Sequence, residues 1–270
     1  MDLANIEHYI CPLNIQNITN WSEDWAWLAG GTWLFSEPQP HLKVLVDMQS
    51  LGWSEIAVQA DNLLIGATCP LIKLWEYHWL PEWKAAAAFK SAISTISASF
   101  KVINMATVGG NICLALAIGN LAPVMVALNA TYEIWKSQGD VRLVAAKDFQ
   151  LGTKITVLQP GEVLRRIIIP LNHLKWQVNY QRFGIAATDP ALAIVVSAYN
   201  PRDSQLRLVL GASVAAPYLI TLNRDLETEN FAFLQNINFI NDARGSAAYR
   251  REITQVLIKR CLADLLWNNP

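Results

Sequence analysis

Two glycine pairs, each beside a threonine, constrain this chain more than any other feature of its sequence. Gly109-Gly110 lies in residues 106–130, which read ATVGGNICLALAIGNLAPVMVALNA, and Gly30-Gly31 lies in the AGGTW of residues 29–33. Adjacent glycines let backbone N–H groups come close to a ligand where any side chain would clash. Amide donors beside the start of a helix suit a bound phosphate or diphosphate. Taken alone, residues 106–130 are more simply a buried loop, kinked at glycine, before a core helix.

The composition indicates a large core and no surface for nucleic acid. The chain has 270 residues, of which 53% are hydrophobic and 16% charged, enough for one large domain or two of moderate size. Apolar residues in this excess predict subunit contacts. The net charge of -1 leaves no electrostatic footprint for a polyanion. The N-terminus lacks the pattern of a signal peptide, and the apolar stretch 106–130 is too often interrupted for a membrane span, so a cytoplasmic protein is expected.

The cysteines and histidines do not form a metal-binding pattern. The four cysteines lie far apart without a CxxC motif, which predicts reduced thiols and no metal or iron–sulfur site in this chain: Cys11, Cys69, Cys113 and Cys261. The histidines lack ligand spacing and are expected at the surface: His8, His41, His78 and His173. No acid–base or nucleophile constellation is present, so we predict no catalytic residue.

Hydrophobic patterning predicts an α+β chain in two parts, with a boundary near Pro170. Strands are expected in the first part at residues 7–10, 25–28, 43–48, 55–59, 62–65, 131–135, 142–145, 155–158 and 163–169. Helices are expected there at residues 68–75, with Thr68 as N-cap, and at 81–89, 91–100 and 121–128. The second part should hold antiparallel strands at residues 174–183, 191–199 and 206–212, and a helix at 246–267. Arg250 and Arg251 should lie on the solvated side of that helix.

The chain has neither of the two commonest nucleotide-binding motifs. A GxGxxG fingerprint and a GxxxxGK[ST] loop are both absent from the sequence. Two separate Gly-Gly loops can instead hold one diphosphate from both sides with backbone donors. Such a site needs few cations, which fits the shortage of Lys and Arg near both loops.

In order and spacing, these motifs resemble the FAD-binding medium subunits of molybdenum hydroxylases, the xanthine dehydrogenase and carbon monoxide dehydrogenase family. The AGGT of residues 29–32 is similar to the family's first flavin loop, and the TVGGN of residues 107–111 to its second. Further similarities lie at LAP (121–123), GEVL (161–164), Asp189 and the tail DARGSAAYRR (242–251). The resemblance covers nearly the whole chain.

The resemblance implies a fold, a cofactor and an assembly. Residues 1–170 would form a PCMH-type FAD-binding domain of two α/β subdomains, and residues 171–270 a C-terminal α+β domain with an antiparallel sheet and helices. A large partner subunit would hold a molybdenum–pterin cofactor, and a small partner two two-iron two-sulfur clusters. This oxidoreductase subunit would pass electrons from those clusters through FAD to an external acceptor, within a dimer of heterotrimers.

The resemblance also assigns cofactor-binding roles to particular positions. Backbone donors and one hydroxyl would come from Ala29, Gly30, Gly31, Thr32 and Trp33. Donors from the other side would come from Thr107, Val108, Gly109, Gly110 and Asn111. Further contacts would come from Asn120, from Leu164 near the flavin or adenine, and from Arg182 at the edge of the flavin ring.

The chain departs from the family pattern at the end of the second loop. The family usually has a serine-proline pair and an aspartate where this chain has Leu116, Ala117 and Asn120. It also has Ile185-Ala186 in place of an arginine pair, so NAD is not assumed as the acceptor. Two alternatives therefore stay open. One is a scaffold or assembly subunit without functional flavin, and the other is a stand-alone PCMH-type flavin oxidoreductase.

Overall fold

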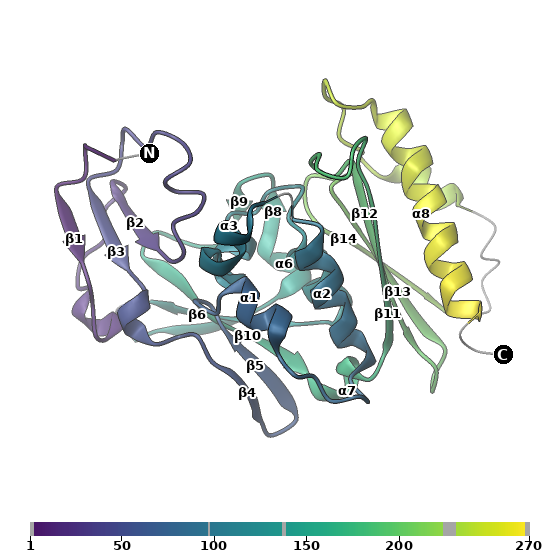
Figure 1. The fold of residues 1–270 in the computed structure, drawn as a ribbon, viewed down its shortest axis with the longest axis horizontal. Coiled ribbons are helices and arrows are strands. Elements are labelled where there is room, and N and C mark those ends of the chain that lie inside the picture. Colours follow the sequence, from purple (N-terminus) through teal and green to yellow (C-terminus); the bar gives the residue numbers. More distant parts are fainter. Residues whose placement is uncertain (1–2, 97, 137–138, 224–230, 268–270) are drawn as a thin grey trace.

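Three larger β-sheets follow one another along the molecule in chain order, beside a two-stranded one (Figure 1). The computed structural model describes the whole chain except residues 1–2, 97, 137–138, 224–230 and 268–270. The mixture of helices with parallel and antiparallel sheets confirms the α+β prediction. Short 3-10 helices connect the main elements at Ile15–Asn17, Gln49–Leu51, Lys84–Ala86 and Ala232–Asn236.

The first sheet is small and parallel. Its strands are β1 (His8–Ile10), β2 (Trp25–Leu28) and β3 (Val44–Asp47), in the order β1-β3-β2. The central strand β3 is apolar and buried on both faces, as its run of β-branched and aliphatic residues predicts. The first glycine pair follows directly after β2, so this sheet sets its position.

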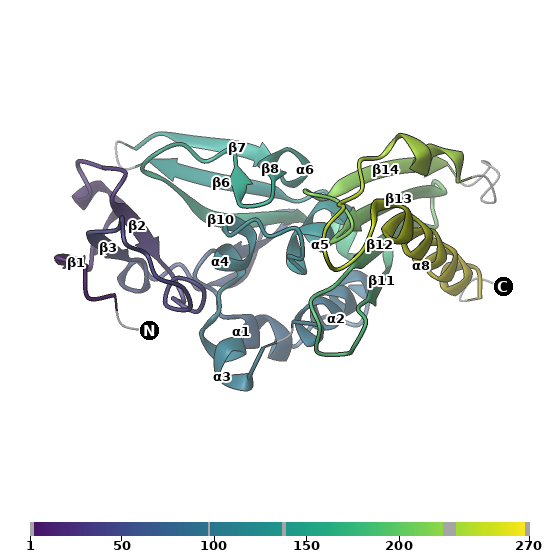
Figure 2. The same ribbon diagram turned by 90° about the horizontal axis from the view of Figure 1, so that it is seen from above.

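The second sheet is antiparallel, with the strand order β4-β5-β10-β6-β7. Its strands are β4 (Ile56–Gln59), β5 (Asn62–Gly66), β6 (Thr131–Lys136), β7 (Val141–Ala145) and β10 (Glu162–Pro170). Figure 2 shows one side of this sheet covered by helices. Those helices are α1 (Leu71–Glu76), α2 (Ala87–Ser94), α3 (Phe100–Met105), α4 (Val108–Cys113) and α5 (Leu121–Ala127). After β7 come α6 (Ala146–Phe149) and a hairpin of β8 (Gln150–Gly152) and β9 (Ile155–Thr156).

The third sheet is an antiparallel meander that begins after α7 (Leu171–Leu174). Its strands are β11 (Gln177–Phe183), β12 (Ala193–Asn200), β13 (Gln205–Gly211) and β14 (Tyr218–Asn223). Helix α8 (Ala247–Trp267) covers one face, where Leu257, Ile258 and Cys261 pack on Val195 and Leu208. Helices α2 and α5 cover the other face.

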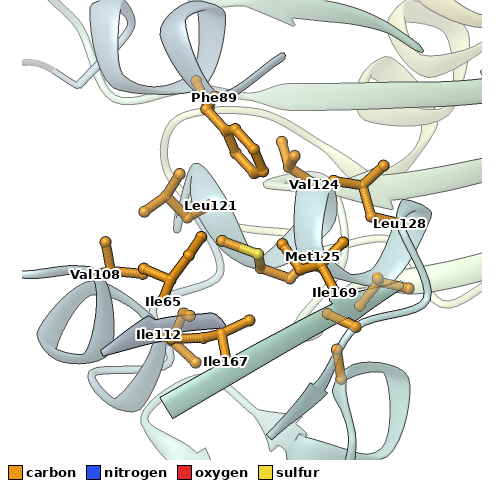
Figure 3. Packing of buried hydrophobic residues seen from close by; sticks show 14 of the residues in the cluster. Ile65, Phe89, Val108, Ile112, Leu121, Val124, Met125, Leu128, Ile167 and Ile169 are labelled. Carbon is orange, nitrogen blue, oxygen red and sulfur yellow. The ribbon is translucent and has the colours of Figure 1, made fainter. Parts of the chain in front are cut away.

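Helix α5 lies at the centre of the main hydrophobic core. Figure 3 shows its residues Leu121, Val124 and Met125 pointing toward Phe89 of α2 and Ile167 of β10. The same cluster includes residues from the third sheet, so the core continues across Pro170. The division into domains 1–170 and 171–270 therefore stays a prediction. Its boundary coincides with the end of β10, but the hydrophobic core continues across it.

The helices before the second glycine pair differ from the prediction. Instead of helices at 81–89 and 91–100, the structure has α2 ending at Ser94 and the short α3 beginning at Phe100. The hydroxyl groups of Ser94 and Thr95 donate to backbone carbonyl oxygens three residues back, at 2.8 and 2.9 Å. Such bonds compete with the helical pattern and favour its end.

Two other element boundaries were predicted wrongly. Thr68 does not cap α1, because its N–H donates to the carbonyl of Trp53 at 2.9 Å and Pro70 occupies the N-cap position. The strand expected from residue 174 starts at Gln177, because α7 and a hydrogen-bonded turn precede it. Both differences reflect tertiary or turn contacts that hydrophobic patterning does not encode.

Two charged or polar side chains expected at the surface are buried. Arg250 is 0% exposed, although the helix that carries it was predicted correctly. His173 is also buried, and its Nδ1 lies 2.9 Å from the carbonyl oxygen of Leu128. Burial lowers the pKa of His173, which favours the neutral ring. The other three histidines are exposed as predicted.

Candidate functional site

The two glycine pairs meet at one cleft of about 760 Å³. We call residues 29–36 the first glycine loop and residues 106–120 the second glycine segment. The cleft lies between them, and it is also lined by residues around Thr95 and Ser99, by Arg182 of β11 and by residues 190–191 before β12. Its volume is within the range of roughly 300–1,000 Å³ that cofactor and small-molecule sites occupy.

The first glycine loop offers unpaired backbone donors to this cleft. Within the part of the chain that the structure describes, the N–H groups of residues 30–34 have no hydrogen-bond acceptor. All five residues line the cleft. Backbone N–H groups need a partner when they leave water, so a run of free donors at a cleft suits an anionic ligand.

Each glycine of the first pair is required for a different structural reason. A Cβ on Gly30 would overlap the carbonyl oxygen of Met105, so this glycine lets the loop contact the second glycine segment's N-terminal end. Gly31 has φ +68°, in the left-handed region, and a Cβ there would lie 2.7 Å from the ring of Phe35. The pair therefore fixes both the conformation of the loop and its distance from the opposite wall.

The second glycine pair is not a free loop, and this corrects the expectation of backbone donors there. Thr107 caps α4, accepting from the N–H of Gly110 at 3.0 Å, and its carbonyl accepts from the N–H of Asn111 at 2.9 Å. The N–H groups of Val108 and Gly109 donate to carbonyls of Cys69 and Ala67, each at 2.9 Å. Residues 108–111 have thus already used their amides within the protein.

Free donors on this side come instead from the stretch where the sequence departs from the family. The N–H groups of residues 116–118 have no acceptor among the described residues, and Leu116 and Ile118 line the cleft. A backbone donor does not depend on the side chain that it belongs to. The replacement of serine and proline by Leu116 and Ala117 therefore does not remove the main-chain N–H donors of this stretch.

Asn120 is committed to the wall of the cleft by its side chain. The amide Nδ2 donates to Thr95 Oγ1 at 2.7 Å and to the carbonyl of Ala92 at 3.1 Å. The hydroxyl of Tyr180 lies 3.1 Å from Thr95 Oγ1, which extends this network to β11. Burial raises the pKa of Tyr180 to about 12, so the phenol stays protonated at neutral pH.

Arg182 is the only charged side chain among the described residues that line the cleft. Its guanidinium donates to the carbonyl oxygens of Ala187 and Asp189, which orients it from the loop after β11. Burial raises the pKa of the Cys113 thiol, which also lines the cleft, to about 12. The cleft thus combines neutral donors, one cation and no reactive thiolate.

Most residues assigned to the site from the sequence lie together at this cleft. Those that line it are Ala29, Gly30, Gly31, Thr32, Trp33, Thr107, Gly110, Asn111, Asn120 and Arg182. Val108 and Gly109 are buried beside it, and Leu164 is 1% exposed in the hydrophobic core without lining it. The wall around Thr95 and Ser99 does not follow from the sequence prediction, although these hydroxyl residues are an available signal for it.

The described residues contain neither a membrane-spanning helix nor a metal-binding cluster. No helix in the described part is long and apolar enough to cross a membrane. No group of three His, Cys, Asp or Glu side chains is placed to hold a metal ion, among the same residues.

The chain belongs to a family described as the FAD binding domain in molybdopterin dehydrogenase, which residues 4–172 match. This match confirms the resemblance inferred from the glycine motifs, and it makes FAD the cofactor of the family's domain. Both glycine pairs and the whole 95–120 region lie inside the matched range.

Individual relatives extend the similarity over the rest of the chain. The carbon monoxide dehydrogenase medium chain of Afipia carboxidovorans is 26% identical over 263 residues, 91% of this chain and 90% of that one. The nicotine 6-hydroxylase medium subunit of Paenarthrobacter nicotinovorans is 27% identical over 178 residues. This match spans 61% of our chain and 62% of that subunit, less than two thirds of its length. A chain of quinoline 2-oxidoreductase from Pseudomonas putida 86 shares the fold, with a TM-score of 0.82 at 23% identity over 98% of both chains.

The residues of the cleft fit the FAD of this family. A dinucleotide carries a diphosphate, and the unpaired N–H groups of residues 30–34 and 116–118 are donors of the kind that bind one. Arg182 supplies a positive charge, and no carboxylate among the described lining residues opposes an anion. The absence of Cβ atoms at Gly30 and Gly31 lets the first loop pack closely against Met105 and Phe35, which fixes the position of its donors.

Proposed function

We propose that this chain is the FAD-binding, electron-transfer medium subunit of a cytoplasmic molybdenum hydroxylase complex. In this proposal FAD binds in the cleft between the two glycine segments. A small partner with two two-iron two-sulfur clusters delivers electrons, and a large partner holds the molybdenum–pterin cofactor. Two such heterotrimers form the assembly. The observation that carries the proposal is the run of unpaired donors at residues 30–34, inside the range matched by an FAD-binding family.

The chain's own residues would bind and orient the cofactor. The N–H groups of residues 30–34 and 116–118 would donate to the diphosphate, and Arg182 would contribute attraction at the other end of the cleft. The hydrogen bonds joining Asn120, Thr95 and Tyr180 would keep the wall between them fixed. FAD, when bound, supplies the redox chemistry, and the protein supplies its position and electrostatic surroundings.

Binding of FAD to the purified chain tests this proposal. The chain is freed of cofactor, titrated with FAD and followed by flavin fluorescence and visible absorbance, with FMN as a matched ligand that lacks the diphosphate-linked adenosine. We expect saturable binding of FAD with a clear preference over FMN, and a rise in thermal stability with FAD concentration. A correctly folded chain that binds no FAD, alone or with its partners, would contradict the proposal.

Affinity purification from the native host tests the assembly. We expect a molybdenum-containing chain and an iron–sulfur chain to co-purify with this one, and the complex to show a flavin spectrum. A complex that contains the molybdenum subunit but no flavin would instead support the scaffold alternative. Recovery of a flavin-loaded chain without partners would support the stand-alone flavin oxidoreductase.

A further inference from the structure

Arg250 is a fully buried arginine whose guanidinium is shared among several parts of the chain. Nη2 donates to both carboxylate oxygens of Asp242, at 2.8 and 2.9 Å. Nη1 donates to the carbonyl oxygens of Leu192 at 2.8 Å and Ala212 at 3.1 Å. A buried charge is retained only when it is paired and hydrogen-bonded, and here both conditions are met.

The carbonyl of Leu192 lies next to the wall of the cleft that the C-terminal part forms. Leu192 directly follows Pro190 and Ala191, which line the cleft. Its own N–H donates to the carbonyl of Phe183 at 2.8 Å, beside Arg182. Arg250 therefore holds the base of the loop whose carbonyl oxygens orient Arg182, the only charged side chain among the described lining residues.

The other carbonyl leads to the opposite wall. Ala212 has φ +58°, an uncommon conformation for a residue other than glycine. Its N–H donates at 2.9 Å to the carbonyl of Ala117, between the cleft-lining residues Leu116 and Ile118. The carbonyl oxygen of Ala212 thus accepts a hydrogen bond from Arg250, and the N–H of the same residue donates one to the second glycine segment.

A second contact ties the same two segments together, but it does not involve Arg250. Gln150 Nε2 donates to the carbonyls of Ala115 at 3.0 Å and Ala215 at 3.1 Å. The second glycine segment is therefore docked on residues 212–215 at two points. Of these, the Ala212 contact is the one that a hydrogen bond from Arg250 connects to the tail helix among the described residues.

Asp242 keeps the guanidinium in place from the solvent side. Its Oδ1 also accepts from the N–H of Arg244 at 3.0 Å and of Gly245 at 3.2 Å, so the carboxylate is held by a tight turn. The hydrogen bonds from Arg250 hold the pKa of Asp242 below its ordinary value. The side chain of Arg244 also approaches this carboxylate, at 3.6 Å, but it is 43% exposed and contacts neither wall.

We propose that Arg250, oriented by Asp242, is a positioning residue for the FAD cleft. It fixes the distance between the wall at 116–118 and the wall at Arg182, Pro190 and Ala191. This role rests on the proposed function, because the ligand whose affinity it tunes is the FAD of that proposal. The tail segment 242–251, which does not touch the cleft, thereby takes part in cofactor binding.

The test compares Asp242→Asn with Arg244→Ala in the full-length chain. Asn at 242 can still accept from the turn but no longer pairs its charge with Arg250, whereas Arg244→Ala removes only the exposed contact. Partners that orient the contacting groups of a metal site are typically worth tenfold or more in affinity, and we expect roughly tenfold weaker FAD binding for Asp242→Asn. Arg244→Ala should bind FAD as the unaltered chain does. Arg250→Lys, which keeps the charge but loses the fork, should weaken binding as Asp242→Asn does.

Amide hydrogen exchange in the cofactor-free chain separates positioning from a general loss of stability. The amides of Ala212, Leu192 and Gly119 should exchange faster in Asp242→Asn, while that of Leu257, in the middle of α8, should not change. A uniform increase across the chain, or unchanged FAD affinity of the folded protein, would overturn the proposal. If the unaltered chain binds no FAD, the proposed function fails, and the exchange experiment still decides whether Arg250 couples the two walls. If Arg250→Lys does not fold, Asp242→Asn decides alone.

Discussion

The first glycine loop and the second glycine segment both contain a glycine pair beside a threonine, but their backbone amides are used differently. In the first, a glycine pair after a strand leaves the amides of residues 30–34 without acceptors among the described residues. In the second, a glycine pair begins α4, and the amides of residues 108–111 are bonded within the chain. A glycine pair beside a threonine therefore predicts close backbone packing, but it does not show whether ligand or protein is the neighbour.

The first loop should be the more sensitive of the two, and Gly31→Ala tests this. Its left-handed φ of +68° and the clash with Phe35 at 2.7 Å should displace the loop, because keeping its conformation would cost about 3 kcal/mol. FAD binding would have to restore that conformation, so we expect an affinity on the order of a hundredfold lower. Gly52→Ala is the matched control, because Gly52 has φ +69° with no atom within 4 Å and does not line the cleft. Both variants should lose some stability, but only Gly31→Ala should lose FAD in a fluorescence titration. Equal affinities would show that the first loop does not hold the cofactor.

The two glycines of the second segment should separate stability from binding. A Cβ on Gly109 would lie 2.6 Å from the carbonyl oxygen of Ala67, so Gly109→Ala should lower the free energy of unfolding by roughly 1–3 kcal/mol. A Cβ on Gly110 would meet only Thr107 Oγ1, at 2.9 Å, and Gly110 lines the cleft. Gly110→Val should therefore cost less stability than Gly109→Ala and bind FAD at least about tenfold more weakly. Urea unfolding and FAD titration of both variants check this, and the reverse pattern would contradict it.

Restoring the family's aspartate at Asn120 should destabilise this chain rather than improve it. Asn120→Asp removes the donor to the carbonyl of Ala92 and leaves that buried acceptor facing a carboxylate. We expect a loss of about 1–3 kcal/mol in the free energy of unfolding, measured with urea. Asn104→Asp is the control, because its bond to the carbonyl of Phe100 is accessible to solvent. A variant as stable as the unaltered chain would mean that the Asn120 network does not hold the wall.

The smallest expected effect concerns the cap of α4. Thr107→Val removes the acceptor of the Gly110 N–H and should cost about 1 kcal/mol, whereas Thr107→Ser should cost less because it keeps the hydroxyl. Thermal unfolding of the two variants measures the difference. Equal losses in both would indicate that packing of the threonine methyl group, not the cap, stabilises this helix start.

The sequence predicted where chain segments come together better than it predicted what their polar groups do. Most strands, helix α5 and the meeting of the two glycine pairs followed from local pattern and from a specific resemblance, whereas β8 and β14 were not predicted. The occupied amides at 108–111 did not, because their acceptors, such as the carbonyl of Ala67, come from a distant strand end. Hydrogen-bond pairing across the fold is a tertiary property, and residue types alone do not encode it.

The prediction that Arg250 lies at the surface was wrong for a different reason, because the sequence does contain a pattern that indicates its burial. Arg250, Thr254, Leu257 and Cys261 follow the helical spacing and are all buried. Assigning Arg250 to the solvated face relied on its charge rather than on its position in that stripe. An arginine that continues an apolar stripe is better treated as a candidate for a paired, buried role.

The scarcity of charge in the cleft has a consequence for how the cofactor is held. Salt screens attraction between charges, whereas short hydrogen bonds from backbone dipoles are affected far less. With Arg182 the only charged side chain among the described lining residues, most of the affinity for an anionic dinucleotide would come from neutral donors. The chain would then retain its cofactor over a wide range of ionic strength.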